Sequence, residues 1–470
     1  MKLPLTPPTM KSLLDPVMKS RSAARLSNLL MTGVGPAPDD RYLHWDRLRH
    51  LTPPNSFTTD EWWLAIKIAR QALYRRLPLV DKAGRPFHYL MPDLVLRALN
   101  QIDRDAGGNI QAPEPVTNPQ TRDSYLVRSL IEEAITSSQL EGAATTHRVA
   151  KEMLRQGRKP LNRGEQMIAN NYRAMQVLRE WRGKQLTTDM VMELQAVLTE
   201  RTLDNPSAAG RFRRSEEAIN VVDTRDSTLL HDPPDAAELP DRVQLLCDFA
   251  NDASLGPFMH PVIRAVVLHF WLAYDHPFVD GSGRTARALF YWSMAEQGYW
   301  LMEYVSISRI LRQAPSQYAR AFLYVETDDN DLTYFIVHQL DVIQKAIAEL
   351  HDYLARKTAE VRVTLDLIRQ SPVLRDMMNH RQVALLDHAL KHPDATYTIE
   401  GHRRSHDISY ATARADLLGL ADLALLDQAK VGREFVFFSF PDLRLRLTDL
   451  AKKRGRVEVL KENGGEPPNL

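Results

Sequence analysis

The sequence predicts a mainly α-helical protein with two short β-hairpins. Apolar residues recur at three- and four-residue spacing through most of residues 122–357, which is typical of amphipathic helices. Two interruptions place β-prone runs on either side of a polar turn, one within residues 210–240 and one within residues 425–438. The chain of 470 residues is longer than one ordinary domain of ~100–200 residues, so we expect two or three domains.

Composition and charge are those of an ordinary globular protein. Hydrophobic residues make up 44%, and 60 Lys and Arg against 59 Asp and Glu leave a net charge of +1, which gives no overall attraction to nucleic acid or membranes. The single cysteine, Cys247, excludes an internal disulfide. The longest apolar stretch, residues 262–274, contains Arg264 and His269 and is shorter than the ~20 residues of a spanning helix. We therefore expect a cytoplasmic protein without a membrane partner.

The pattern along the chain divides it into five segments. Several prolines and no sustained periodicity indicate a flexible N-terminal arm over residues 1–40. Residues 41–121 predict an N-terminal helical region that ends in a proline-containing linker. The main helical domain follows over residues 122–357, and a smaller domain over residues 358–450. Residues 451–470 form a basic, then Gly- and Pro-rich tail.

The segment HPFVDGSGRTAR, which runs from His276 to Arg287 between two predicted helices, has the features of an anion site. Gly281 and Gly283 allow backbone N–H groups to approach a ligand, and the next helix offers its positive N-terminal end. Arg284 and Arg287 share a helix face in the predicted first turn, where positive charge opposes the helix dipole. A bound polyphosphate would compensate them, since the planar guanidinium group suits phosphate oxygens.

Two further side chains fit phosphate chemistry. Asp280 alone would repel phosphates but would anchor them through Mg²⁺, which is commonly held by one or two carboxylates plus phosphates. His276, at a helix-to-loop corner, can accept a proton from an attacking hydroxyl near neutral pH. The alternative is a capped helix start with a buried histidine and two solvated arginines. The coincidence of so many specified residue types favours the functional interpretation.

This segment resembles the Fic family signature, a His-x-Phe-x-Asp/Glu-Gly-Asn-Gly-Arg-x-x-Arg pattern. The flanking His260-Pro261 and residues 210–213 fit the family too, and the resemblance covers roughly residues 120–350. It implies a Fic helical core with a small β-hairpin flap, residues 215–230, that binds a target protein by strand pairing. It also implies a protein adenylyltransferase, which transfers AMP from ATP to a protein hydroxyl and modifies itself as well.

The resemblance implies a role for each matching residue. His276 would be the general base, and Asp280 would hold Mg²⁺. The residues that would bind ATP are Gly281, Ser282, Gly283, Arg284, Arg287 and Tyr318. The glycine loop would bind the α-phosphate and the arginines the outer phosphates, while the tyrosine, on a weaker match, would lie near the adenosine. Ser282 departs from the family pattern, which usually has asparagine, and this puts the catalytic rate and the choice of nucleotide in question.

A second motif lies at the end of the amphipathic helix predicted over residues 123–141. Gly142 suits the position just beyond a helix, and Glu141 falls in the predicted last turn, where negative charge needs an arginine partner. Most such glutamates are merely solvated. In a chain with the Fic signature, however, Ser137, Glu141 and Gly142 resemble the family's inhibitory motif. The resemblance implies that Glu141 pairs with Arg287, blocks the γ-phosphate and so causes autoinhibition.

The smaller domain, residues 358–450, is predicted to be a winged helix-turn-helix. Residues 408–417 resemble a recognition helix and residues 431–433 a wing turn. Between residues 381 and 434, however, acidic residues slightly outnumber basic ones, whereas a DNA-binding domain usually has a basic face. A contact with protein is therefore favoured over a contact with DNA.

Two alternatives to AMP transfer stay open. The same fold could remove AMP from a modified protein, with Glu141 positioning water, or transfer another nucleotide. The chain could also be a non-enzymatic regulator that binds DNA through its smaller domain. The sequence does not identify the target protein or what relieves the inhibition, and it leaves the oligomeric state open, with a homodimer among the alternatives.

Overall fold

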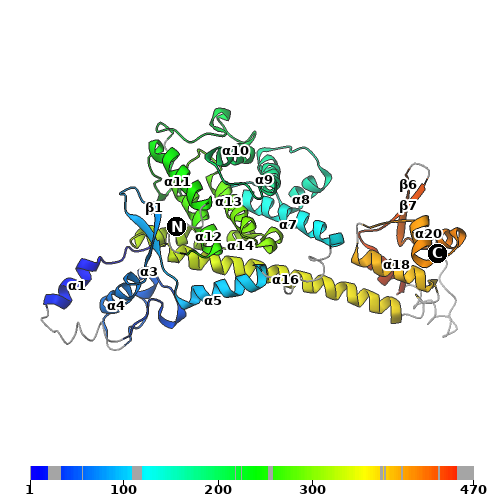
Figure 1. Cartoon of the computed structure of the whole chain (residues 1–470), viewed down its shortest axis with the longest axis horizontal. Coiled ribbons are helices and arrows are strands. Elements are labelled where there is room, and N and C mark those ends of the chain that lie inside the picture. Colours follow the sequence, from blue (N-terminus) through cyan, green and yellow to red (C-terminus); the bar gives the residue numbers. More distant parts are fainter. Residues whose placement is uncertain are drawn as a thin grey trace. The chain divides into compact units, whose positions relative to one another are not determined.

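The computed structural model describes residues 2–19, 33–54, 57–107, 119–217, 219–223, 225–251, 258–370, 374, 377–392, 395–431 and 434–451. These residues are mostly helical and contain small antiparallel sheets of two or three strands, so the prediction of a mainly α-helical fold is confirmed (Figure 1). No helix among them combines the length and the apolar character that crossing a bilayer requires.

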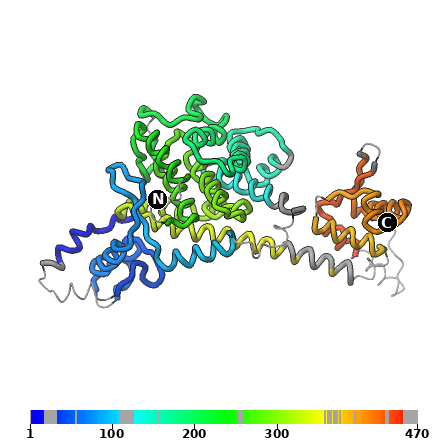
Figure 2. The backbone as a smooth tube through the Cα atoms, viewed as in Figure 1, coloured from blue at the N-terminus to red at the C-terminus, as the bar shows by residue number. Residues whose placement is uncertain are grey.

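The chain forms two compact units. One contains residues 1–112 and 125–350, and the other contains residues 113–124 and 351–470. The long helix α16 (Thr333–Gln370) contributes residues to both (Figure 2). The expected site residues from Ser137 to Tyr318 all lie in the larger unit.

The larger unit begins with short helices and one hairpin. Its first helical elements are α1 (Met10–Lys19), η1 (Pro38–Asp40), α3 (Trp45–Leu48), α4 (Thr59–Gln71), α5 (Asp93–Ile102) and η2 (Asp103–Gly107). Between α4 and α5, β1 (Arg75–Val80) pairs antiparallel with β2 (Pro86–Tyr89). The prediction of a helical region over residues 41–121 is wrong at this hairpin, where Leu77 and Leu79 alternate with exposed residues around a turn at Gly84.

The predicted flexible arm also differs from the structure, because α1 lies within it. The amphipathic segment packs through Leu13 into a cluster with the buried tryptophans of α3 and α4. Residues 20–32 of the arm, residues 111–118 of the linker and residues 452–470 of the tail lie outside the described residues.

The N-terminal region is joined to the turn before α16 by buried charges. Arg70 is fully buried, stacks on the ring of Tyr42 at 3.8 Å and donates to the hydroxyl of Tyr334 at 2.6 Å. One turn earlier on α4, the ammonium group of Lys67 lies 2.7 Å from the carboxylate of Asp328. Because both cations are desolvated and paired, they fix this region to the helical core.

Two consecutive buried helices, α12 (Pro261–Asp275) and α13 (Ser282–Glu296), form the centre of the larger unit. Both are buried on nearly all sides, as expected of core helices. The surrounding elements are α7 (Pro119–Leu140), α8 (His147–Gln156), α9 (Arg163–Glu180), α10 (Thr188–Thr199), η3 (Pro206–Ala208), η4 (Ala236–Glu238), α11 (Leu239–Asn251), η5 (Trp300–Tyr304), α14 (Ile307–Gln313) and α15 (Pro315–Thr327). The predicted site therefore lies between the two best-buried helices.

The predicted flap is a small antiparallel hairpin of β3 (Val221–Val222) and β4 (Leu229–His231). Val222 and Leu229 are exposed apolar residues on these strands. The hairpin agrees with the expected position, although residues 218 and 224 lie outside the described part.

The smaller unit has its own apolar core, which includes Leu386, Leu417 and Phe437. Its elements are α18 (His380–Lys391), β5 (Thr396–Thr398), α19 (Ile399–His406), α20 (Tyr410–Asp422), β6 (Leu426–Val431) and β7 (Glu434–Ser439). The strands form a sheet in the order β5-β7-β6. Assignment of this unit as a winged helix stays a prediction, and the expected wing-turn residues 432–433 lie outside the described residues.

Candidate active site

The backbone turns sharply between α12 and α13 at His276. This residue ends α12 in the left-handed region, at φ 44°, and its carbonyl oxygen accepts a hydrogen bond of 2.9 Å from Nε of Arg213. Its Nδ1 lies 3.4 Å from the carbonyl oxygen of Ala273, which can only accept, so Nδ1 carries the proton. Nε2 is therefore left with a lone pair. Burial, and next the charge of His231, lower the pKa of His276 to about 4, so the ring is neutral near pH 7.

The loop after His276 is held from behind by Gln195 of α10. The Gln195 side chain donates to the carbonyl oxygen of Asp280 at 3.0 Å and accepts from the backbone N–H of Gly210 at 2.7 Å. Gly281 is the N-cap residue of α13, at φ 91°, and a Cβ there would lie 2.9 Å from the methyl carbon of Thr199. The glycine is thus required both by conformation and by space.

Ser282 uses its hydroxyl within the loop. Oγ accepts a hydrogen bond of 3.2 Å from the backbone N–H of Phe278, and the residue is 1% exposed. The side chain therefore closes the turn, and only the backbone N–H of this residue belongs to the positive end of α13.

The two arginines of α13 have different partners. Arg284, in the first turn, donates to the carbonyl oxygen of Leu198 and to the carboxylate of Asp280, each at 2.9 Å. Its buried Nε has no hydrogen-bond partner among the described residues. Arg287 lies in the second turn, not in the first turn as predicted, and its Nε donates to Oγ of Ser137 at 2.9 Å. An orphaned buried donor on Arg284 fits an anion bound at this end of the helix.

Glu141 occupies the space in front of α13. Its Oε1 lies 2.8 Å from Nη2 of Arg287, and a Cβ added to Gly283 would lie only 2.3 Å from the same oxygen. Burial by itself would raise the pKa of Glu141, but Arg287 and Arg284 outweigh it and hold the pKa below its usual value. The structure thus places an ionised carboxylate at the helix start, where a phosphate was expected.

Glu141 lies one residue beyond α7, which runs from Pro119 to Leu140 instead of over residues 123–141. Gly142 follows at φ 91°, in the left-handed conformation typical of a residue beyond a helix end. A second arginine contact holds this helix end, because Nη2 of Arg287 also donates to the carbonyl oxygen of Ser137 at 3.0 Å. Two residues of the predicted inhibitory motif, Ser137 and Glu141, therefore contact the same arginine.

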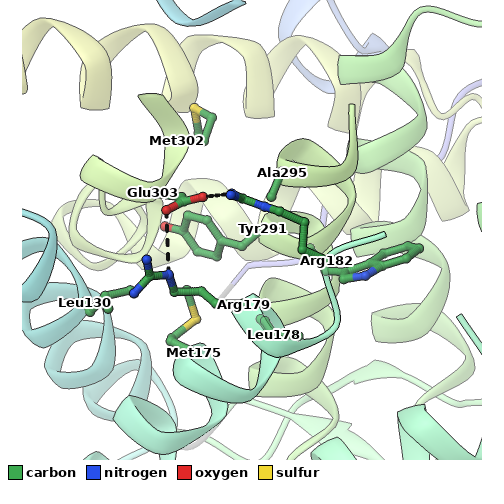
Figure 3. A pocket seen from close by; sticks show the side chains of 10 residues that line it. Leu130, Met175, Leu178, Arg179, Arg182, Tyr291, Ala295, Met302 and Glu303 are labelled. Carbon is green, nitrogen blue, oxygen red and sulfur yellow. Dashed lines mark hydrogen bonds and ion pairs between the residues drawn. The ribbon is translucent and has the colours of Figure 1, made fainter. Parts of the chain in front are cut away.

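The middle of α7 is held by Glu133, a residue that sequence reasoning missed. Its buried carboxylate accepts hydrogen bonds from the Tyr291 hydroxyl at 2.7 Å and from Oγ of Ser306 at 2.8 Å. Figure 3 shows the apolar pocket beside this contact, where Glu303 lies between two arginines above Tyr291. Such a fully satisfied buried carboxylate fixes the register of α7 and hence the position of Glu141.

One cavity brings five of the predicted residues together, namely Glu141, His276, Gly283, Arg287 and Tyr318. It is lined by Glu141, Val221, Leu230, His231, Ala273, Tyr274, His276, Gly283, Arg287, Tyr318, Ala319, Phe322, Leu323 and Glu326. The flap strands form one wall and α15 forms another, and the hydroxyl of Tyr318 lies 2.8 Å from Nε2 of His269. Asp280 instead lines a neighbouring open hollow, together with Glu141 and Arg163.

The acidic residues near the loop could hold a hard cation only with outside help. Among the described residues, no three His, Cys, Asp or Glu side chains are grouped as a metal site. Asp280 offers a partly exposed carboxylate, of which Oδ1 already accepts from Arg284. This fits Mg²⁺, which keeps several waters and takes its remaining ligands from bound phosphates.

Comparison with known proteins identifies the domain that carries this loop. Residues 185–294 match the Fic/DOC family. The chain carries a Fic domain. The matched range contains the flap and the segment from His276 to Arg287, whereas Glu141 and Tyr318 lie outside it.

Curated relatives of the Fic domain are named "Protein adenylyltransferase Fic". The protein from Drosophila willistoni is 32% identical over 95 residues, which cover 20% of this chain and 17% of that protein. The protein from Nematostella vectensis is 30% identical over 110 residues, which cover 23% and 22% of the two chains. The chain thus spans only about a fifth of the length of these relatives.

Solved structures of Fic proteins also align with this chain. A Fic family protein from Desulfovibrio desulfuricans G20 aligns with 74% of this chain and 95% of its own, at 17% identity and a TM-score of 0.48. Residues 134–508 of Fic-1 from C. elegans align with 56% of this chain and 72% of that one, at 19% identity and a TM-score of 0.44.

Proposed function

We propose that this protein transfers AMP from ATP to a hydroxyl side chain of a protein, and that Glu141 restrains the reaction. The observation that carries the proposal is the cavity that His276, Gly283 of the loop and Arg287 line together. The neutral imidazole of His276 lines the same cavity as the start of α13 and the buried guanidinium of Arg287, where backbone N–H groups and positive charge favour an anion. The names of the curated relatives support the same chemistry.

In the proposed reaction, each group of the site has one role. Nε2 of His276 accepts the proton of the target hydroxyl while the hydroxyl oxygen bonds to the α-phosphorus. The bond from that phosphorus to the bridging oxygen breaks, and pyrophosphate leaves with the electron pair. Backbone N–H groups at the start of α13 stabilise the charge on the α-phosphate, and Arg284 and Arg287 bind the leaving phosphates. Mg²⁺ held by Asp280 would offset the phosphate charge.

Restraint by Glu141 follows from its position. The carboxylate lies at the start of α13 and pairs with the guanidinium of Arg287, and the phosphates would need both. Its negative charge would also repel the phosphates. The contacts of Glu133 keep α7 in this place. ATP must therefore displace Glu141 or bind with its phosphates misplaced, and loss of the carboxylate should free the site.

The test uses ATP labelled on the α-phosphate, with Mg²⁺, and measures label on the protein itself. We expect the Glu141→Gly variant to incorporate at least about tenfold more label than wild type, because ~1.4 kcal/mol of competition is removed. The Glu141→Gly/His276→Ala double variant should lose this gain by about 10²-fold or more. Glu141→Gln is the matched control, since it keeps the bulk and removes the charge. Equal labelling by the Glu141→Gly and double variants would contradict the role of His276.

A further inference from the structure

A second histidine lines the cavity from the flap side. His231 is the last residue of β4 and is 9% exposed. Its Nδ1 lies 2.8 Å from Oε2 of Glu326 on α15, and its Nε2 lies 2.7 Å from the carbonyl oxygen of Tyr274 on α12. One side chain thus ties the flap to two helices that form other walls of the cavity.

The two contacts determine the charge of His231. A carboxylate oxygen and a carbonyl oxygen both accept hydrogen bonds, and a neutral imidazole has only one N–H to donate. The neutral ring would therefore press a lone pair against one of the two oxygens. Only the imidazolium satisfies both, and in keeping with this Glu326 and the Tyr274 carbonyl outweigh burial and raise the pKa of His231.

The other charged groups near His231 and His276 have partners of their own, so His231 and Glu326 form a separate ion pair. The groups that face either histidine are Lys82 after β1, Glu141 after α7, Arg213 before the flap, Asp275 on α12 and Glu326 on α15. Lys82 pairs with Asp232, Asp275 with Arg242, and Glu141 with Arg287. Arg213 donates to backbone carbonyl oxygens, including that of His276.

We propose that His231 is a positioning residue, which as an imidazolium fixes the flap across the cavity and presents a positive charge to His276. The role in catalysis rests on the proposed AMP transfer. The charge favours the neutral form of His276, the form that can accept the proton of the target hydroxyl. The same contacts prevent β4 from moving away from α15, which keeps the edge of the flap in one place for a target segment.

The first measurement is made on the wild-type full chain labelled with ¹⁵N in its histidines. At pH 7 we expect His231 to show two protonated ring nitrogens and His276 to show one protonated and one bare nitrogen. Variants that lack each histidine assign the signals. A neutral ring at His231 would overturn the proposal. This readout needs no nucleotide, so it is independent of whether AMP transfer occurs.

The second measurement follows the His276 signal through a pH titration in the wild type and two variants. In His231→Gln the lone Glu326 carboxylate remains, so the midpoint for His276 should rise by roughly 0.5–1 pH unit. In the His231→Gln/Glu326→Gln double variant both charges are gone, and the midpoint should return towards wild type. A purely structural role predicts equal midpoints in all variants that keep native tryptophan fluorescence. When His231→Gln is added to the Glu141→Gly variant, the apparent pKa on the acid side of the pH profile of kcat/KM should also rise.

The third measurement tests the tie between flap and α15. Arg225 lies in the flap turn, and its side chain is 65% exposed, which makes it a trypsin site. We expect Glu326→Gln to speed cleavage after Arg225 by at least about threefold, because opening of the hairpin becomes easier by ~0.7 kcal/mol. Unchanged cleavage would show that His231 does not hold the flap.

Discussion

The two compact units use their charged residues in different ways. In the larger unit, buried ion pairs join residues far apart in sequence, such as Lys67 with Asp328 and Arg242 with Asp275. In the smaller unit most pairs lie within one helical turn and are exposed, as for Glu400 with Arg403. Long-range buried pairs determine tertiary structure, whereas local surface pairs contribute little. The difference indicates that precise charge placement matters in the unit with the cavity.

Asp416 is the exception within the smaller unit. Its carboxylate is 4% exposed and accepts from Nε of Arg381 at 2.8 Å and from Nδ2 of Asn379 at 2.7 Å. Nε2 of His402 lies 3.1 Å from Oδ2 of this carboxylate, the oxygen that also accepts from Nε of Arg381. This residue of α20 therefore joins α18 and α19, so the smaller unit also has one interior pair on which its fold depends.

The largest effect is expected at Asp275. Asp275→Ala leaves Arg242 buried without its carboxylate and removes the acceptor of the Trp271 indole, which lies 3.0 Å away. We expect the free energy of unfolding to fall by about 3–5 kcal/mol. Urea unfolding followed by tryptophan fluorescence measures this. Asp232→Ala, which removes an exposed pair with Lys82, is the control and should change little.

A smaller effect is expected for Asp416→Ala. It leaves Arg381 and His402 without their shared acceptor, and we expect the smaller unit to lose about 2–4 kcal/mol. All seven tryptophans precede residue 301, so fluorescence reports on the larger unit alone. Circular dichroism should show earlier loss of helix while the fluorescence transition stays in place. Simultaneous shifts of both transitions would show that the two units unfold together.

The smallest effect is expected for Glu400→Gln. Its carboxylate pairs with Arg403 and Arg404 on the exposed surface of α19. Such pairs are solvated and screened by salt, so the melting temperature should change by no more than about 1 °C. Calorimetry of the variant at low and high salt checks this. A large shift in melting temperature would show that the surface pairs of the smaller unit also stabilise it, contrary to the contrast drawn between the two units.

Features with a local cause could be predicted from the sequence. The helix–loop–helix around His276, the flap hairpin and the mainly helical fold follow from periodicity, glycines and turn residues in short windows. The contact of Glu141 with Arg287 followed only from resemblance, because 146 residues separate the two. A single sequence contains no physical signal for such a contact.

Groups that act on the site from a distance could not be predicted from the sequence. Only folding places Gln195 against the loop, Glu133 against Tyr291 and His231 against Glu326. The hairpin of β1 and β2 was missed because its apolar residues are few and the surrounding helices dominate the periodicity. Ser282 was noticed as a departure, but its bond to the loop backbone could not be foreseen.

The left-handed backbone of His276 has an evolutionary consequence. At φ 44° a histidine is strained relative to glycine, which commonly ends helices in this conformation. A His276→Gly protein would therefore keep the turn and gain stability while it lost the proposed base. Selection for stability alone would drift towards glycine here, so a histidine that persists at this position is a mark of selection for chemistry.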